Sequence, residues 1–308
     1  MEEKYQSEWS RELPMKEQLT IVQRLFRFAK PFRRMFYTAI LFAFGLSIIN
    51  ILLPRVIQVF MDNYLTPKTA TMQVILTFAA IYFFGVIVKS IVWFFQWYLY
   101  SMASLKTYQY IRVKLFEKLH TLGMRYFDQT PAGSTVSRVT NDTETLFEFW
   151  YVFLMVITGI FAVISSFFAM FQLSPEISFY CLIFLPILLV VIWYYQKFSS
   201  KLYRSMREKL SQLNTKLNEY ISGMQIIQQF RQEKRLEKEF EETNDDYLKT
   251  RVAMIRMNSL LLSPIINLLY TLAIALALTM FGIDALHSPV EAGMIYAFVT
   301  YVQAFFNP

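Results

Sequence analysis

The side chains of this chain that could do chemistry are few, and most stand alone inside long apolar segments. Lys89 and Gln96 lie seven residues apart, so they share one helical face, with Trp93 between them. Asn50 and Asn267 sit at comparable depth in two other apolar segments. Polar groups at membrane depth are costly and are therefore functional candidates. Among aromatic neighbours they suit the binding of a bulky amphipathic molecule, and we predict a cavity lined by Asn50, Lys89, Trp93, Gln96 and Asn267.

Packing is the competing interpretation of these residues. Aromatic side chains in membrane helices more often face lipid or a neighbouring helix, and Lys89 can snorkel or pair. Three prolines, Pro54, Pro186 and Pro264, also lie in the apolar segments, where they predict kinks.

The sequence shows no motif for phosphate binding, metal binding or catalysis. A phosphate-binding loop needs the spacing Gly-x-x-x-x-Gly-Lys-Ser/Thr, and none of the eight glycines precedes a lysine. His120 and His287 stand far apart, and Cys181 is the single cysteine, within an apolar run. We predict no catalytic, cofactor or metal site within these 308 residues.

The elements that must position the polar groups are membrane helices. Hydrophobic residues make up 55% of the chain, charged residues 17%, and the mean hydropathy is +0.35. Several apolar runs reach the roughly 20 residues needed to cross a bilayer. The sequence therefore predicts an all-α polytopic membrane protein with spans at 35–59, 72–100, 147–171, 177–198, 257–283 and 294–308.

The charges predict an orientation for these spans. Nearly all Lys and Arg lie in residues 1–35, 101–146 and 197–256, and the exceptions are Arg55, Lys68 and Lys89. The positive-inside rule therefore predicts a cytoplasmic N-terminus and two long cytoplasmic connections. The net charge of +7 follows from this topology, so it does not indicate nucleic-acid binding.

Residues 1–34 form a separate cytoplasmic segment ahead of the first span. Its apolar residues fall on one helical face, and basic residues flank them, which is typical of an amphipathic helix in the membrane interface. An ordinary basic flank is the alternative. We expect the chain to turn into the bilayer at Pro31.

Helical periodicity continues beyond the second and fourth spans. Each extension runs for about 25 residues, or roughly 37 Å at ~1.5 Å per residue. The chain then reverses twice, once in the polar stretch RYFDQTPAGSTVSRVTND at 125–142 and once around Gly223. The following segment mixes acids and bases, as on a solvated helix.

Both reversals carry a pattern that resembles one family. The matching residues of the first are Tyr126, Phe127, Asp128, Gly133, Ser137, Arg138, Asp142 and Leu146. Those of the second are Glu219, Gly223, Ile227, Phe230 and Glu233. Together, in a chain with six spans, they resemble the transmembrane domain of ATP-binding cassette (ABC) exporters of the type-1 fold, over essentially the whole chain.

The resemblance implies that this chain docks on ATPase domains and that ATP binds elsewhere. Residues near 130–138 and 223–230 would be coupling helices that dock on ATPase domains, the second on the domain of a partner subunit. The partner would be a second half-transporter, identical or different, and ATP with Mg²⁺ would bind the ATPase domain rather than this chain. We further expect Gly133 and Gly223 to allow sharp turns, and Arg138 to pair with Asp142.

The end of the chain carries a further expectation. The last run, at 294–308, is short for a span and has no basic residues after it. We therefore expect residues 35–308 to be a six-helix domain truncated in its sixth helix, with the ATPase beyond Pro308. The full-length protein would be an ATP-hydrolysing exporter in the cell membrane, of undetermined substrate.

Two other functions stay open on the sequence. One is a motorless membrane protein that regulates or assembles with another transporter, which would bind no ATPase. The other is a channel or ion-driven carrier, which would need ionisable residues paired across several spans or inverted repeats with broken helices.

Overall fold

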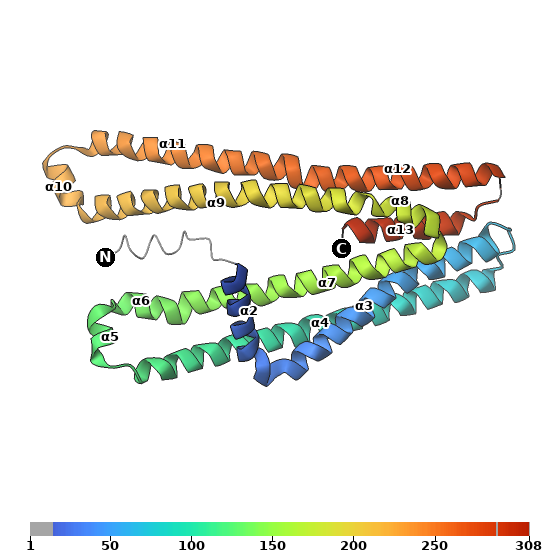
Figure 1. Ribbon diagram of the computed structural model, residues 1–308, viewed down its shortest axis with the longest axis horizontal. Coiled ribbons are helices and arrows are strands. Elements are labelled where there is room, and N and C mark those ends of the chain that lie inside the picture. The colour runs from blue at the N-terminus through green and yellow to red at the C-terminus, as the bar shows by residue number, and fades with distance from the viewer. Residues whose placement is uncertain (1–14, 288, 308) are drawn as a thin grey trace. The chain divides into compact units, whose positions relative to one another are not determined.

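The computed structural model describes residues 15–287 and 289–307, and all its regular elements are helical (Figure 1). The chain forms two compact units. The first, here called the bundle unit, comprises Glu12–Ser178 and Ala277–Pro308, and the second, the hairpin unit, comprises Phe179–Leu276. The predicted N-terminal segment 1–34 and final span 294–308 therefore lie partly outside the described residues.

The bundle unit begins with α2 (Met15–Ala29), the 3₁₀ turn η1 (Lys30–Phe32) and α3 (Arg33–Phe60). A π-helical turn η2 (Met61–Leu65) precedes the long helix α4 (Met72–His120). The chain then reverses through α5 (Met124–Gln129), α6 (Ala132–Ser137) and the π-helical turn η3 (Arg138–Asp142) into α7 (Thr143–Leu173). Helix α13 (Ala292–Phe306) returns to pack on α3 and α7.

The hairpin unit is two long helices joined by a short one. Helix α8 (Pro175–Leu182) leads into α9 (Phe184–Ser222), α10 (Met224–Gln229) and α11 (Glu233–Met257). The π-helical turn η4 (Asn258–Leu262) then joins α11 to α12 (Ser263–His287), whose last residues belong to the bundle unit. Helices α9 and α11 pack along one another.

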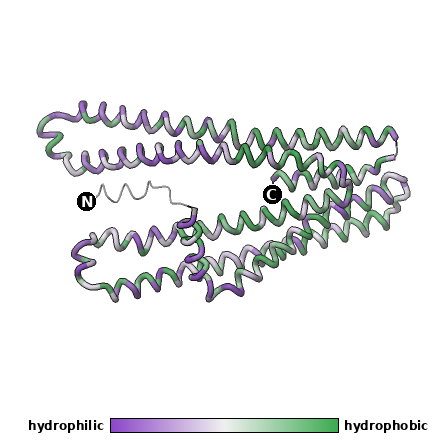
Figure 2. Tube along the Cα trace, viewed as in Figure 1, coloured by the Kyte–Doolittle hydropathy of each residue, from purple (hydrophilic) through white to green (hydrophobic). Residues whose placement is uncertain are grey.

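Five of the six predicted spans are confirmed by the length and hydrophobicity of their helices. Five helical stretches are long and apolar enough to cross a membrane, and Ala292–Phe306 is a shorter apolar helix. Within the span predicted at 177–198, Ile183 separates α8 from α9, close to the kink predicted at Pro186. Pro186 lies just after this break and has no N–H to donate, which accounts for it. In Figure 2 hydrophobic residues concentrate in the spans, and the helical extensions mix hydrophilic and hydrophobic residues.

The other prolines behave differently from one another. The π-helical turn η4 ends directly before Ser263 and Pro264, so the regular α-helical pattern is interrupted there as predicted. Pro54 lies inside α3, which continues without interruption from Arg33 to Phe60. The predicted kink at Pro54 therefore does not break the helix.

Helix α2 joins the bundle through aromatic side chains. The Phe26 ring packs edge-on against Trp150 at 5.4 Å and Phe153 at 5.0 Å between centroids. Ala29 is buried in the same cluster. Leu19, which shares the apolar face, is exposed. The face predicted to lie in the membrane interface therefore packs on the protein at its C-terminal end and is exposed at its N-terminal end.

The turn after η2 holds a lysine in a left-handed conformation. Lys68 has φ 57°, a region that costs residues with a Cβ roughly 1–2 kcal/mol. We expect Lys68→Gly to raise the free energy of unfolding by about 0.5–1 kcal/mol, because glycine adopts this conformation without strain. Thermal unfolding in detergent measures the change. Thr66→Gly is the control, since Thr66 has φ −63° and should lose stability when replaced by glycine.

Candidate functional site

The first reversal projects beyond the apolar part of α4. Gly123 and Thr130 are extended and bound α5, and Pro131 caps α6 with φ −56° and ψ 137°. The residue before a proline is pushed out of the α region, so Thr130–Pro131 sets the corner. The Pro131 carbonyl then accepts hydrogen bonds from the amides of Ser134 and Thr135, at 3.0 and 3.3 Å.

An arginine of α4 clamps this reversal. Nε of Arg112 donates to the Val139 carbonyl at 3.1 Å, and Nη2 donates to the Thr140 carbonyl at 3.2 Å. The guanidinium also lies over the Tyr108 ring, 4.5 Å from its centroid. Both carbonyls belong to η3, so Arg112 fixes the π-helical turn against α4. Sequence reasoning missed Arg112, because nothing in the sequence pairs it with residues 139 and 140.

The predicted ion pair between Arg138 and Asp142 does not form. Nη1 of Arg138 instead donates to the Tyr126 hydroxyl, 3.3 Å away, and both charged side chains are exposed. The two residues bound η3, whose π-helical pattern replaces the i, i+4 bonds of an α-helix by i, i+5 bonds. The α-helical spacing on which the prediction depended is therefore absent.

In the second reversal a single residue, Gly223, separates α9 from α10. The Gly223 amide donates to the Glu219 carbonyl at 2.8 Å, and a Cβ at Gly223 would lie 3.1 Å from that same oxygen. Helix α10 follows directly, and Arg231 beyond it adopts φ 51°. Gly223 is thus favoured by close approach to the preceding turn rather than by left-handed geometry.

Gly133 shows neither a close approach to the preceding turn nor left-handed geometry. Its φ is not positive, and a Cβ added to it would meet no atom within 4 Å. The prediction that Gly133 provides the sharp turn was wrong, because Thr130 and Pro131 make the corner instead.

Both reversals expose large apolar side chains. At the first, Met124 is 74% and Val136 61% exposed. At the second, Ile226 is 62% and Phe230 67% exposed. We call these surfaces the first tip (residues 124–137) and the second tip (residues 221–230). Exposed apolar groups at the ends of hydrophilic hairpins are typical of an interaction site.

The residues that match the family pattern differ in their exposure at these tips. Phe127 and Phe230 are exposed as a docking surface requires, but Ile227 is half-buried and its neighbour Ile226 takes the exposed position. The remaining predicted residues lie at or beside the tips, half-buried in the case of Ser137 and exposed in the others: Asp128, Asp142, Glu219 and Glu233. Their roles stay predictions.

Ion pairs link α9 and α11 next to the second tip. Nζ of Lys216 on α9 donates to Oε1 of Glu239 on α11 at 2.9 Å. This hydrogen bond raises the pKa of the Lys216 ammonium and lowers the pKa of the Glu239 carboxyl. Lys209 lies 3.9 Å from Asp246 further along the same helix pair. Exposed pairs are individually weak, so they set the register of the helices more than their stability.

The predicted cavity residues belong to two different units. In the bundle unit Gln96 is buried, Lys89 is half-buried, and Asn50 and Trp93 are exposed. Asn267 is exposed and belongs to the hairpin unit. The cavity therefore stays a prediction.

Known proteins resemble this chain over most of its length. The family described as "ABC transporter transmembrane region" matches residues 36–308. A "Putative ABC transporter ATP-binding protein exp8" of Streptococcus pneumoniae is 33% identical over 95% of this chain and 50% of its own length. A "Probable multidrug resistance ABC transporter ATP-binding/permease protein YheH" of Bacillus subtilis is 35% identical over 73% of this chain and 34% of its own. A "Multidrug resistance-like ATP-binding protein MdlB" of Buchnera aphidicola is 28% identical over 94% of this chain and 50% of its own length. The chain thus spans half the length of these relatives or less.

Proposed function

Because this chain belongs to the family of ABC transporter transmembrane regions, of the exporter type, we propose that its two tips dock on ATPase domains. The proposal rests on one observation above all. The reversal between α4 and α7 and the reversal between α9 and α11 each carry large apolar side chains that are exposed within the described chain.

The proposed partner is an ATPase domain that follows Pro308 or is supplied by a separate subunit. Relatives named as ATP-binding proteins are about twice as long as this chain, which supports the first arrangement. ATP with Mg²⁺ bound to that domain supplies the free energy for transport. Two copies of the transmembrane region, identical or different, would enclose the transport pathway.

The predicted cavity supports a proposal for the substrate class. Polar groups such as Lys89 and Gln96 among aromatic side chains suit lipophilic and amphipathic molecules, drugs and lipids included. Two of the relatives carry multidrug resistance in their names, which agrees with such a class. The charge distribution supports a cell-membrane protein with a cytoplasmic N-terminus and cytoplasmic tips.

A pair of substitutions at the second tip tests the docking proposal. We expect Ile226→Glu combined with Phe230→Glu to weaken binding of the ATPase domain at least tenfold, because apolar anchors at interface centres each contribute about 2 kcal/mol or more. Affinity is measured between the reconstituted chain and its ATPase domain, and ATP-driven efflux is measured in vesicles containing the full-length protein.

The control is Leu248→Glu, at an apolar position of α11 that is 53% exposed and lies away from the tip. It should leave both measurements unchanged. Unaltered affinity and efflux in the double variant would refute docking through the second tip. A wild-type chain that binds no ATPase domain would favour the motorless regulator instead.

A further inference from the structure

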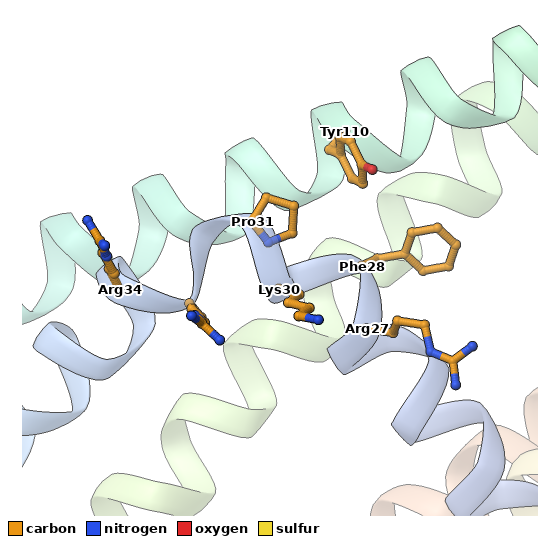
Figure 3. Close-up of a pocket in the computed structure, with 7 residues that line it drawn as sticks. Arg27, Phe28, Lys30, Pro31, Arg34 and Tyr110 are labelled. Carbon is orange, nitrogen blue, oxygen red and sulfur yellow. The ribbon is translucent and has the colours of Figure 1, made fainter.

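We propose that the groove between η1 and α4 binds the headgroup of an anionic phospholipid. The groove has a volume of about 720 Å³. In Figure 3, Pro31 and Phe28 lie nearest the Tyr110 ring of α4, and the side chains of Arg27, Lys30 and Arg34 extend around them. It is lined by Arg27, Phe28, Lys30, Pro31, Arg33, Arg34 and Tyr110.

The charge of the groove is of one sign. Its lining includes four cations and no acid, and within residues 15–287 and 289–307 none of the four lies within 4.0 Å of a carboxylate. Glu117, the acidic residue of α4, is instead held by Lys114 at 2.7 Å. Arginine guanidinium groups bind phosphate oxygens through paired hydrogen bonds. A phosphate is therefore the chemical group that this groove fits.

The position of the groove indicates a lipid rather than a soluble phosphate. Arg33 and Arg34 begin α3, and the apolar run of the first span starts directly after them. On the other wall, the Phe32 ring packs edge-on against Tyr110 at 6.3 Å, and aromatic side chains of this kind concentrate at membrane interfaces. The cations thus lie at the level where headgroups lie.

An apolar track continues from the cations along α3. Tyr37 and Leu41 are each 68% exposed and follow Arg34 at helical spacing, with Phe44 and Ile48 exposed beyond them. These side chains share one face, because the intervals of three and four residues match the helical repeat. A phospholipid has the same order of parts, a charged headgroup followed by apolar chains.

Binding of phosphatidylglycerol and phosphatidylcholine with identical acyl chains tests the site. Lipid adducts on the purified chain are counted by native mass spectrometry, without nucleotide or ATPase domain, so failure here leaves the docking proposal untouched. We expect wild type to prefer phosphatidylglycerol. The double variant R27Q/K30Q, which keeps Arg33 and Arg34 at the start of the span, should bind it at least fivefold more weakly.

Controls separate charge, fold and ligand source. K234Q/K238Q removes the same charge from exposed positions of α11 and should retain the preference. R27K/K30R keeps the charges and should bind like wild type, even if the glutamine variant proves unstable. Equal binding of both lipids, or equal affinity in R27Q/K30Q and wild type, would overturn the proposal. So would displacement of phosphatidylglycerol by millimolar inorganic phosphate, which would assign the groove to a soluble anion.

Discussion

Gly293→Ala is expected to lower the free energy of unfolding by about 3 kcal/mol, more than a methyl group in a membrane helix normally would. Gly293 lies in the first turn of α13, where that helix meets α3 and η2. A Cβ there would lie 2.5 Å from the Gln58 carbonyl oxygen and 2.6 Å from Oδ1 of Asp62. The first of these atoms is backbone, so the helices would have to separate.

Separation would also break the polar contacts between these elements. The Gly293 amide donates to Oδ1 of Asp62 at 2.6 Å, and this carboxylate caps the N-terminus of α13 from η2. Further along, the Tyr301 hydroxyl donates to the Ile51 carbonyl at 2.8 Å. Both bonds depend on the close approach that Gly293 allows.

Gly282→Ala is the matched control for this prediction. Gly282 lies in α12, and a Cβ added to it would meet no atom within 4 Å, so alanine should raise stability by about 0.5–1 kcal/mol through helix propensity alone. Asp62→Ala should cost about 1–2 kcal/mol, the usual loss of a cap. Thermal unfolding in detergent compares the variants. A Gly293→Ala protein as stable as Gly282→Ala would show that the helices do not require this contact.

Much of the fold follows from patterns that are local in the sequence. Long apolar runs predict the spans, and uninterrupted helical periodicity predicts that α4 and α9 continue beyond them. The two reversals are also local, because Pro131 and Gly223 punctuate otherwise helical stretches. These features need no knowledge of what each helix packs against.

Contacts distant in sequence were not predicted. Asp62 caps a helix 231 residues away, and Arg112 clamps carbonyls 27 and 28 residues away. The π-helical turn η3 was missed as well, and with it the reason that Arg138 does not pair with Asp142. At the second tip the family pattern selected Ile227, whereas helical phase exposes Ile226. Tertiary packing, rather than local propensity, decides each of these.

Trp150→Ala is the second substitution expected to have a large effect, a loss of about 3–5 kcal/mol. Trp150 is 1% exposed at the centre of a cluster that joins α2, α3, α4 and α7. Its ring lies 4.8 Å from Phe36 and 5.4 Å from both Phe26 and Phe149. Alanine would remove the contacts that these three rings share with Trp150, and contact with lipid tails cannot replace an interlocked ring.

Two further substitutions separate packing from polarity in this cluster. Among the described residues Nε1 of Trp150 has no hydrogen-bond partner, so Trp150→Phe removes volume but no bond and should cost less than about 1.5 kcal/mol. Tyr151→Ala, at the next and half-exposed position, should cost about 1 kcal/mol or less. Thermal unfolding measures all three, and hydrogen exchange of residues 15–29 reports whether α2 detaches. If Trp150→Ala matched Tyr151→Ala in both measurements, the cluster would not be what holds α2 to the bundle unit.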